Sequence, residues 1–331
     1  MWAGIAFGGD TAMIDVADVR AAAARIQGRV RRTPVMEVEP AEFVPERATA
    51  PAKVWLKLEL TQHTGSFKAR GAFNRILRAE EEGLLPEAGV IAASGGNAGL
   101  AIAYAASQVG AKAEVYVPET APQVKVAKLR ALGATVVQVG VKYADAHEAA
   151  VKRTAETGAL FCHPYDQPEM CAGQGVIGLE LLEQTAGEVD TVLLAVGGGG
   201  LMAGVAAALE GKATVVGVEP SAAPTLNAAL RAGRPVDVEV SGVAADSLGA
   251  TRAGEIAHAV ATRTGVQSVL VPDEAISEAR RRIWEDYRLV VEHGTAAAAA
   301  ALRAGAYRPE ADERVAVLLC GANTALGDLA V

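Results

Sequence analysis

The chain has 331 residues, more than one hydrophobic core usually accommodates, so we expect two domains or one large α/β domain with a lobe. Hydrophobic residues make up 51% of the chain and aromatic residues only 4%, which is typical of helices packed on parallel sheets through small side chains. The formal net charge of −8, with no block of lysines or arginines, argues against nucleic-acid partners and anionic membranes.

The first residues and the cysteines indicate where the protein works. Residues 1–12 are apolar but lack a basic start and a long hydrophobic run, so we expect an extension that is neither a signal peptide nor a membrane span. Cys162, Cys171 and Cys320 are odd in number, and their spacings of 9 and 149 residues fit neither a disulfide framework nor a zinc site. The predicted location is therefore cytoplasmic.

Strand and helix patterns alternate along the first half, as expected for βα units. In chain order the predicted elements are a helix from about Asp15 to Gln27, a strand over Lys53–Leu60, a helix from Lys68 to Glu82, a strand over Val90–Ala93, a helix through Tyr104, a strand over Glu114–Val117, a helix through Leu129 and a strand over Thr135–Val139.

The second half continues this alternation, which predicts an α/β fold with parallel sheets because each parallel connection needs a crossover. Its predicted elements are a helix near Val176–Gln184, a strand over Thr191–Val196, a helix to Leu209, a strand over Thr214–Glu219, a strand over Ser268–Val271, a helix over Asp273–Tyr287, an alanine-rich helix after Thr295 and a strand over Arg314–Leu319.

Lys68 stands in the run Ser66-Phe67-Lys68 at the start of a predicted helix. An isolated lysine in such a place is most often a solvated helix residue. Here Ser66 can cap the helix, and Phe67 offers an aromatic face to a flat ring. A lysine that is made nucleophilic by desolvation can form a Schiff base with an aldehyde.

Four consecutive glycines, Gly197–Gly200, join an apolar strand to a helix. Such a loop leaves N–H groups free to hold an anion where the helix dipole also helps, so phosphate binding is the favoured interpretation. A flexible hinge is the plainer alternative. A dinucleotide-binding site is the more specific alternative, because Gly198, Gly200 and Ala203 fit the pattern G-x-G-x-x-A. Glu219 ends the next strand, where such a site has its ribose-binding acid.

The run Ser94-Gly95-Gly96-Asn97 also joins a strand to a helix, so its N–H groups suit a substrate carboxylate. Glycine and asparagine also occur at such corners for backbone reasons alone. A reactive lysine and a separate phosphate loop are together what a protein needs to hold pyridoxal phosphate. The dinucleotide alternative leaves Lys68 and this run unexplained.

These segments together resemble the fold type II pyridoxal-phosphate enzymes, and within them the serine/threonine dehydratase and serine racemase group. The resemblance implies two parallel-sheet α/β domains, as in the tryptophan synthase β chain: a large cofactor-binding domain of residues 1–60 and 164–331, and an inserted small domain, 61–163, that closes over the substrate. It is carried, in the family's order along most of the chain, by Ser66–Lys68, Ser94–Asn97, His163–Leu181, Gly197–Gly200, Glu219–Pro220 and Cys320–Gly321.

The resemblance also implies a role for each site residue. Cys320 is expected to lie against the nitrogen of the cofactor's pyridine ring. Its neutral thiol cannot keep that nitrogen protonated, which favours elimination over transamination. The implied roles are the Schiff-base lysine for Lys68, stacking on the ring for Phe67, a contact to the 3′ oxygen for Asn97, phosphate binding for Gly197, Gly198, Gly199 and Gly200, a contact to the ring nitrogen for Cys320, and substrate carboxylate binding for Ser94, Gly95, Gly96 and Asn97.

Two positions help to choose among the relatives. The racemases carry a serine as second base where this chain has Gly95, so racemisation is disfavoured. The metal-binding relatives use a glutamate, a carbonyl and an aspartate, and the matching positions are Glu219, Ala223 and Thr225. The missing carboxylate favours a monovalent ion such as potassium, and a site without any ion is the alternative.

The chain departs from many relatives at Glu292-His293, where they have Glu-Pro, so the wall on that side of the ring differs and substrate size is open. His293 is either a proton carrier or a structural residue at a helix start.

We therefore predict a lyase that eliminates the β-hydroxyl of L-threonine or L-serine and releases ammonia with 2-oxobutyrate or pyruvate, Lys68 being the general base. One alternative is elimination, replacement or epimerisation of another β-substituted amino acid, such as a bulkier 3-hydroxy amino acid. The others are an NAD-dependent dehydrogenase and a non-catalytic cofactor-binding paralogue. The family expectation is a homodimer.

Overall fold

The computed structural model describes residues 13–325 and residue 327, so the predicted extension over residues 1–12 lies outside the described part. The strands form two sheets. Listed across the larger sheet, they are β1 (Val35–Val38), β2 (Lys53–Lys57), β10 (Arg314–Leu318), β7 (Thr191–Ala195), β8 (Thr214–Pro220) and β9 (Gln267–Val271). Across the smaller sheet they are β5 (Thr135–Gln138), β4 (Ala113–Val117), β3 (Val90–Ala93) and β6 (Leu160–Phe161).

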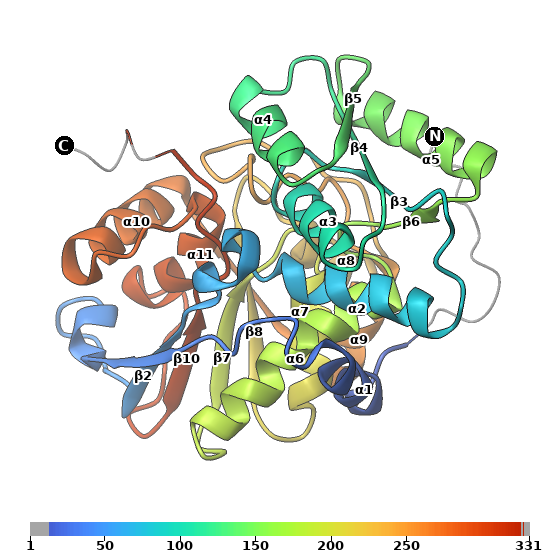
Figure 1. Ribbon diagram of the computed structural model, residues 1–331. Coiled ribbons are helices and arrows are strands. Elements are labelled where there is room, and N and C mark those ends of the chain that lie inside the picture. The colour runs from blue at the N-terminus through green and yellow to red at the C-terminus, as the bar shows by residue number, and fades with distance from the viewer. Residues whose placement is uncertain (1–12, 326, 328–331) are drawn as a thin grey trace.

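Every strand pair is parallel except that of β1 with β2, which is antiparallel. The predicted α/β fold class is confirmed. The smaller sheet is built entirely within segment 61–163 and the larger one entirely outside it, while the exact domain boundaries stay a prediction. Figure 1 shows the smaller sheet above the larger one, with strands from both chain ends, β2 (blue) and β10 (red), side by side.

Helices cover both sheets, and those predicted from the sequence are present with ends shifted by a few residues, except that the helix predicted near Val176–Gln184 begins at Pro168. Three helices, α5, α8 and α9, and the short strands β1 and β6 were not predicted. The helices are α1 (Val16–Ile26), α2 (Lys68–Glu81), α3 (Asn97–Gln108), α4 (Gln123–Ala131), α5 (Tyr143–Thr157), α6 (Pro168–Gln184), α7 (Gly200–Leu209), α8 (Thr225–Ala232), α9 (Glu255–Thr264), α10 (Asp273–Tyr287) and α11 (His293–Arg303), with 3-10 turns at Pro40–Phe43, Glu59–Thr61 and His63–Gly65.

Small residues let the helices approach their neighbours closely. Residues 296–301 of α11 are six consecutive alanines, all fully buried, and this helix packs against β7, β8, β9 and β10. Helices α6 and α7 touch through Gly175 and Gly204, where a Cβ atom on Gly204 would lie 2.1 Å from the carbonyl oxygen of Cys171. This contact brings the segment before α6 beside the glycine loop before α7.

A buried ion network anchors the start of α2. Arg70 contacts Glu59 and Glu180 at 2.7 Å each, and Lys57 contacts Glu180 at 2.7 Å. The side chains of Lys57, Glu59 and Arg70 are completely buried. Buried charges are tolerated only when they are paired, so this network fixes α2, and Lys68 two residues earlier, against β2 and α6.

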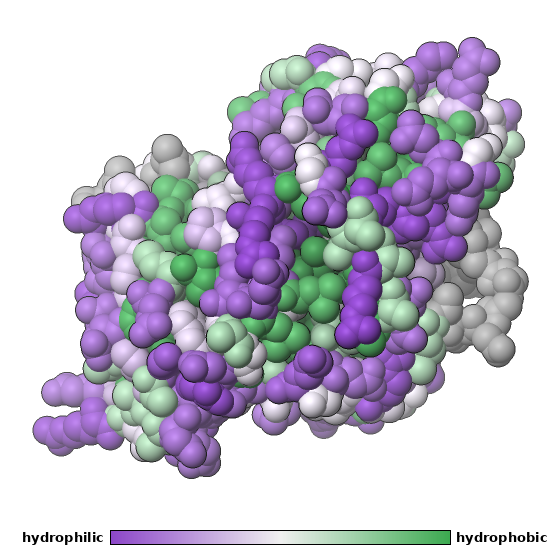
Figure 2. Space-filling model, turned by 60° about the horizontal axis from the view of Figure 1, so that its bottom comes forward, coloured by the Kyte–Doolittle hydropathy of each residue, from purple (hydrophilic) through white to green (hydrophobic). Residues whose placement is uncertain are grey.

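The surface shows no single dominant apolar patch on the face drawn in Figure 2, where polar side chains (purple) and apolar ones (green) are interspersed. Within residues 13–325, no helix is both long enough and apolar enough to cross a lipid bilayer.

Candidate active site

Lys68 is the first residue of α2, and its side chain is partly buried. Its Nζ donates a 2.7 Å hydrogen bond to the carbonyl oxygen of Pro164, which follows β6. Burial lowers the pKa of Lys68 to about 8. About one amine in ten is therefore neutral, and so nucleophilic, at pH 7.

Ser66 does not have its predicted role. The prediction that Ser66 caps α2 is wrong, because the N-cap position is Phe67 and no side chain caps the helix. Ser66 instead pairs with Gly321 in an isolated antiparallel bridge, and its buried hydroxyl has no hydrogen-bond partner among the described residues. The extended backbone that this bridge requires takes the place of a capping turn.

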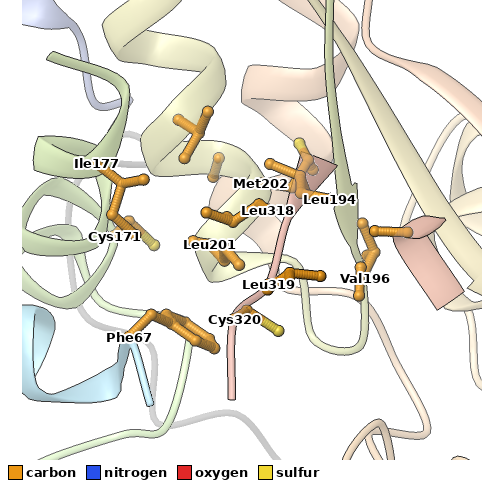
Figure 3. Packing of buried hydrophobic residues seen from close by; sticks show 14 of the residues in the cluster. Phe67, Cys171, Ile177, Leu194, Val196, Leu201, Met202, Leu318, Leu319 and Cys320 are labelled. Carbon is orange, nitrogen blue, oxygen red and sulfur yellow. The ribbon is translucent and has the colours of Figure 1, made fainter. Parts of the chain in front are cut away.

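The bridge joins the lysine segment to the end of β10. The backbone N–H of Phe67 donates a 3.0 Å hydrogen bond to the carbonyl oxygen of Cys320. Figure 3 shows Phe67 and Cys320 at one edge of an apolar core that also contains Cys171 and Leu201. Two predicted site residues that are far apart in the sequence are thus adjacent.

Cys320 carries a neutral thiol. Burial raises its pKa to about 12. Its Sγ lies 3.2 Å from the hydroxyl oxygen of Thr295, and that hydroxyl donates to the carbonyl oxygen of Gly321 at 2.9 Å. A neutral group at this place agrees with the predicted contact to a ring nitrogen that is not held protonated.

The glycine loop forms a cradle of free N–H groups. Gly199 has a φ of +87°, which favours glycine, and α7 begins at Gly200. Among the described residues, the backbone N–H groups of Gly197, Gly198, Gly199 and Gly200 donate to no protein acceptor. Free donors at a helix N-terminus fit an anion such as a phosphate ester.

Packing gives a second reason for these glycines, which the sequence did not reveal. A Cβ atom on Gly198 would lie 2.3 Å from the Cγ atom of Tyr165, and one on Gly199 would lie 2.5 Å from the Cβ of Ala257. The Tyr165 ring therefore rests directly on the loop. Tyr165 directly follows Pro164, the residue that receives the Lys68 hydrogen bond, so one segment touches both parts of the site.

The run Ser94–Asn97 joins β3 to α3, as predicted. The N–H of Gly96 donates to the Ser94 hydroxyl at 3.3 Å, and Asn97 is the first residue of α3. The Asn97 carboxamide contacts Glu292 and Asn323, two residues that sequence reasoning did not assign to the site. His293 is the first residue of α11, and its predicted proton-carrier role stays untested.

Glu219 is completely buried and its carboxylate is bound by protein donors. It accepts hydrogen bonds from the N–H groups of Leu226 and Asn227 at 2.6 and 2.8 Å, and from the Thr225 hydroxyl at 3.0 Å. Burial raises the pKa of Glu219 to about 7. This carboxylate is engaged by donors at the start of α8, which argues against the ribose-binding acid that the dinucleotide alternative needs. A potassium site at Glu219, Ala223 and Thr225 stays a prediction.

The sequence matches a known family over most of its length. The family model described as pyridoxal-phosphate dependent enzyme matches residues 26–321. The L-threonine ammonia-lyase of Thermotoga maritima is 36% identical over 293 residues, which is 88% of this chain and 71% of the relative. The phenylserine dehydratase of Ralstonia pickettii is 36% identical over 317 residues, 95% of this chain and 94% of the relative.

The fold is also similar to that of solved structures. The structure of maize serine racemase has a TM-score of 0.86 and 30% sequence identity, and the match covers 95% of each chain.

Proposed function

Because the chain belongs to the family of pyridoxal-phosphate-dependent enzymes, we propose that it catalyses β-elimination of the hydroxyl group of L-threonine, L-serine or both. The products are ammonia and 2-oxobutyrate or pyruvate. The observation that carries this proposal is the amine of Lys68, which is partly buried with a lowered pKa and sits in a segment joined to Cys320.

The site residues fit the cofactor. When bound, pyridoxal phosphate supplies an aldehyde for covalent attachment and an electron sink for bonds at the substrate α carbon. Lys68 would hold the aldehyde carbon, the free N–H groups of Gly197–Gly200 would hold the phosphate, and Phe67 and Cys320 would border the ring. These assignments rest on the desolvated amine, the unpaired donors and the neutral thiol described above.

In the proposed reaction Lys68 has two tasks. Its amine would hold the aldehyde carbon of the cofactor at rest, and as a free amine it would accept the α proton of the substrate as general base. The Pro164 carbonyl holds this amine in place at 2.7 Å. Backbone N–H groups of Ser94–Asn97 at the start of α3 would orient the substrate carboxylate.

A second candidate substrate class is a bulkier 3-hydroxy amino acid. It is favoured by the phenylserine dehydratase relative, which matches nearly the whole of both chains. The resemblance implies a proline after Glu292 in many relatives, and His293 at that place, the first residue of α11, would give a different wall that agrees with a substrate of different size.

The proposal is tested with the purified protein loaded with pyridoxal phosphate. We expect a yellow protein whose cofactor is fixed by borohydride, and keto-acid release from at least one of L-serine, L-threonine and L-phenylserine. Lys68→Ala should abolish borohydride fixation and reduce turnover by several orders of magnitude, while the half-exposed Lys53→Ala should change neither. Full turnover by Lys68→Ala would refute the mechanism, and a colourless protein with dinucleotide affinity would refute the function.

Two further expectations accompany the proposal. The three cysteines are free and buried, which supports a reducing cytoplasmic location. A homodimer is the family expectation, and light scattering of the purified protein tests it.

A further inference from the structure

The Asn97 carboxamide is held at both of its polar atoms. Its Nδ2 donates to the two carboxylate oxygens of Glu292 at 2.9 and 3.1 Å. Its Oδ1 accepts a 2.7 Å hydrogen bond from the Nδ2 of Asn323. Glu292 and Asn323 lie 195 and 226 residues from Asn97 in the sequence.

Asn323 is itself fixed by further hydrogen bonds. Its backbone N–H donates to Glu292 Oε1 at 2.8 Å, and its Nδ2 also donates to the carbonyl oxygen of Thr64 at 2.7 Å. Both Nδ2 hydrogens of Asn323 are thereby used, so this group can only present donors to Asn97. The loop before Lys68, the segment after β10 and the start of α3 meet at this side chain.

The glycine after Cys320 makes room for this arrangement. A Cβ atom on Gly321 would lie 2.8 Å from Glu292 Oε1 and 3.4 Å from Asn97 Nδ2. The buried Glu292 carboxylate therefore fills space beside the backbone that carries the Cys320 thiol.

These contacts permit one orientation of the Asn97 carboxamide. A 180° flip would place the NH₂ group against the NH₂ group of Asn323, which is repulsive because the Asn323 hydrogens are held by Thr64, and Oδ1 against Glu292, which is repulsive when that carboxylate is ionised. In the observed orientation Oδ1 is occupied, and the two Glu292 oxygens, which belong to one carboxylate and lie on the same side of Nδ2, share one Nδ2 hydrogen. The second Nδ2 hydrogen is the group that Asn97 can offer to a ligand.

We propose that Glu292 and Asn323 are positioning residues that fix the Asn97 carboxamide as a hydrogen-bond donor to the phenolic oxygen of pyridoxal phosphate. This inference rests on the proposed function and deepens it. A freely rotating amide would offer its oxygen about as often as its nitrogen, and an oxygen facing an anionic phenolate repels it.

A double-mutant cycle tests the inference. The apoprotein is titrated with pyridoxal phosphate, and affinity, visible absorption spectrum and apoprotein melting temperature are recorded. Asn97→Ala is expected to weaken binding about tenfold or more, because a hydrogen bond to a charged group is lost. Asn323→Ala should weaken binding several-fold and shift the absorption maximum in the same direction. The double variant should bind no more weakly than Asn97→Ala, since Asn323 acts through Asn97.

Two further variants separate orientation from general stability. Glu292→Gln retains an acceptor that can serve both Asn97 and Asn323, so it should bind the cofactor more tightly than Glu292→Ala. Asn74→Ala removes another buried asparagine with two hydrogen bonds, to Arg25 and to the Glu169 carbonyl, and should lower the melting temperature without shifting the spectrum.

Fully additive effects of Asn97→Ala and Asn323→Ala would overturn the inference, as would an Asn323→Ala variant that loses stability but keeps the wild-type affinity and spectrum. In either case the proposed function stands if the wild-type protein binds pyridoxal phosphate and releases keto acid. A wild-type protein that takes up no cofactor would overturn both.

Discussion

The Nζ atom of Lys68 lies 2.7 Å from the carbonyl oxygen of Pro164, and this contact joins the start of α2 to the segment that rests on the glycine loop. A carbonyl accepts a hydrogen bond from a neutral or a charged amine, so it holds Lys68 without fixing its charge. Burial decides the charge, and it lowers the pKa from 10.5 to about 8.

We therefore predict a pH dependence for cofactor attachment. Below pH 8 Lys68 is mostly protonated, and the neutral fraction rises as pH increases through 8, from about one in ten at pH 7. The rate at which apoprotein binds pyridoxal phosphate covalently should rise with pH to a plateau above about 8, as followed by stopped-flow absorbance. A rate that keeps rising toward pH 10.5 would show that Lys68 is not desolvated.

Gly198→Ala should disrupt the phosphate cradle. The new methyl group would lie 2.3 Å from the Cγ atom of the Tyr165 ring. Because Cγ is close to the Tyr165 backbone, the ring cannot relieve this clash without a shift of the main chain. We expect at least a tenfold loss of affinity for pyridoxal phosphate in an equilibrium titration. Adding Tyr165→Ala removes the clash and should restore part of the affinity, and a double variant as weak as Gly198→Ala would contradict this explanation.

Arg70→Ala should destabilise the protein strongly. It leaves Glu59, which is completely buried, without its guanidinium partner, and breaking a buried ion pair from one side costs about 3–5 kcal/mol. Urea denaturation should show this loss in the free energy of unfolding. Arg281→Ala is the control, because its half-exposed pairs with Glu278 and Glu285 should contribute less than about 1 kcal/mol. An equal loss in the free energy of unfolding for Arg70→Ala and Arg281→Ala would contradict the prediction.

The ion pair between Lys125 and Asp246 should tune substrate binding. The 2.5 Å contact joins α4, beside the smaller sheet, to the loop between α8 and α9. In that loop the Ser247 hydroxyl accepts from the N–H of Gly294, and Leu248 borders Gly197. A charge reversal, Lys125→Asp, should raise KM up to about fivefold, the range of an exposed pair.

The swapped variant Lys125→Asp/Asp246→Lys should recover most of the wild-type KM, and added salt should reduce the difference between wild type and Lys125→Asp. Steady-state kinetics at low and high ionic strength measure both effects. If the KM of the swapped variant is as high as that of Lys125→Asp, the ion pair does not link α4 to the loop between α8 and α9.

Gly95→Ser should fold normally. A Cβ atom on Gly95 would make an ordinary 3.4 Å contact with Val117, and its φ is not in the left-handed region, so stability should change by less than about 0.5 kcal/mol. Because the resemblance implies that racemases carry their second base at this position, we expect slow formation of D-serine from L-serine, measured by chiral chromatography. A stable, active variant that makes no D-serine would contradict the assigned role of this position.

Local signals were sufficient for much of the fold. The strand Val90–Ala93 and the helix Asp273–Tyr287 have their predicted bounds, because each is marked by a continuous apolar run or a helical pattern between breakers. The strand β1 was missed because its four residues, VMEV, gain strand character only by pairing with β2. The cap at Ser66 was wrong because a bridge to Gly321 overrides the local preference.

The sequence alone therefore determined the parallel α/β class, the lysine segment and the two loops that suit anions, since strand–turn–helix corners and glycine runs are contiguous in the chain. Only the tertiary structure decided what surrounds them. It placed Tyr165 on the glycine loop, buried the Lys68 amine, enclosed the Glu219 carboxylate and joined Asn97 to Glu292 and Asn323. Those contacts link residues far apart in sequence, and burial and hydrogen bonding between such residues exist only once the elements have packed.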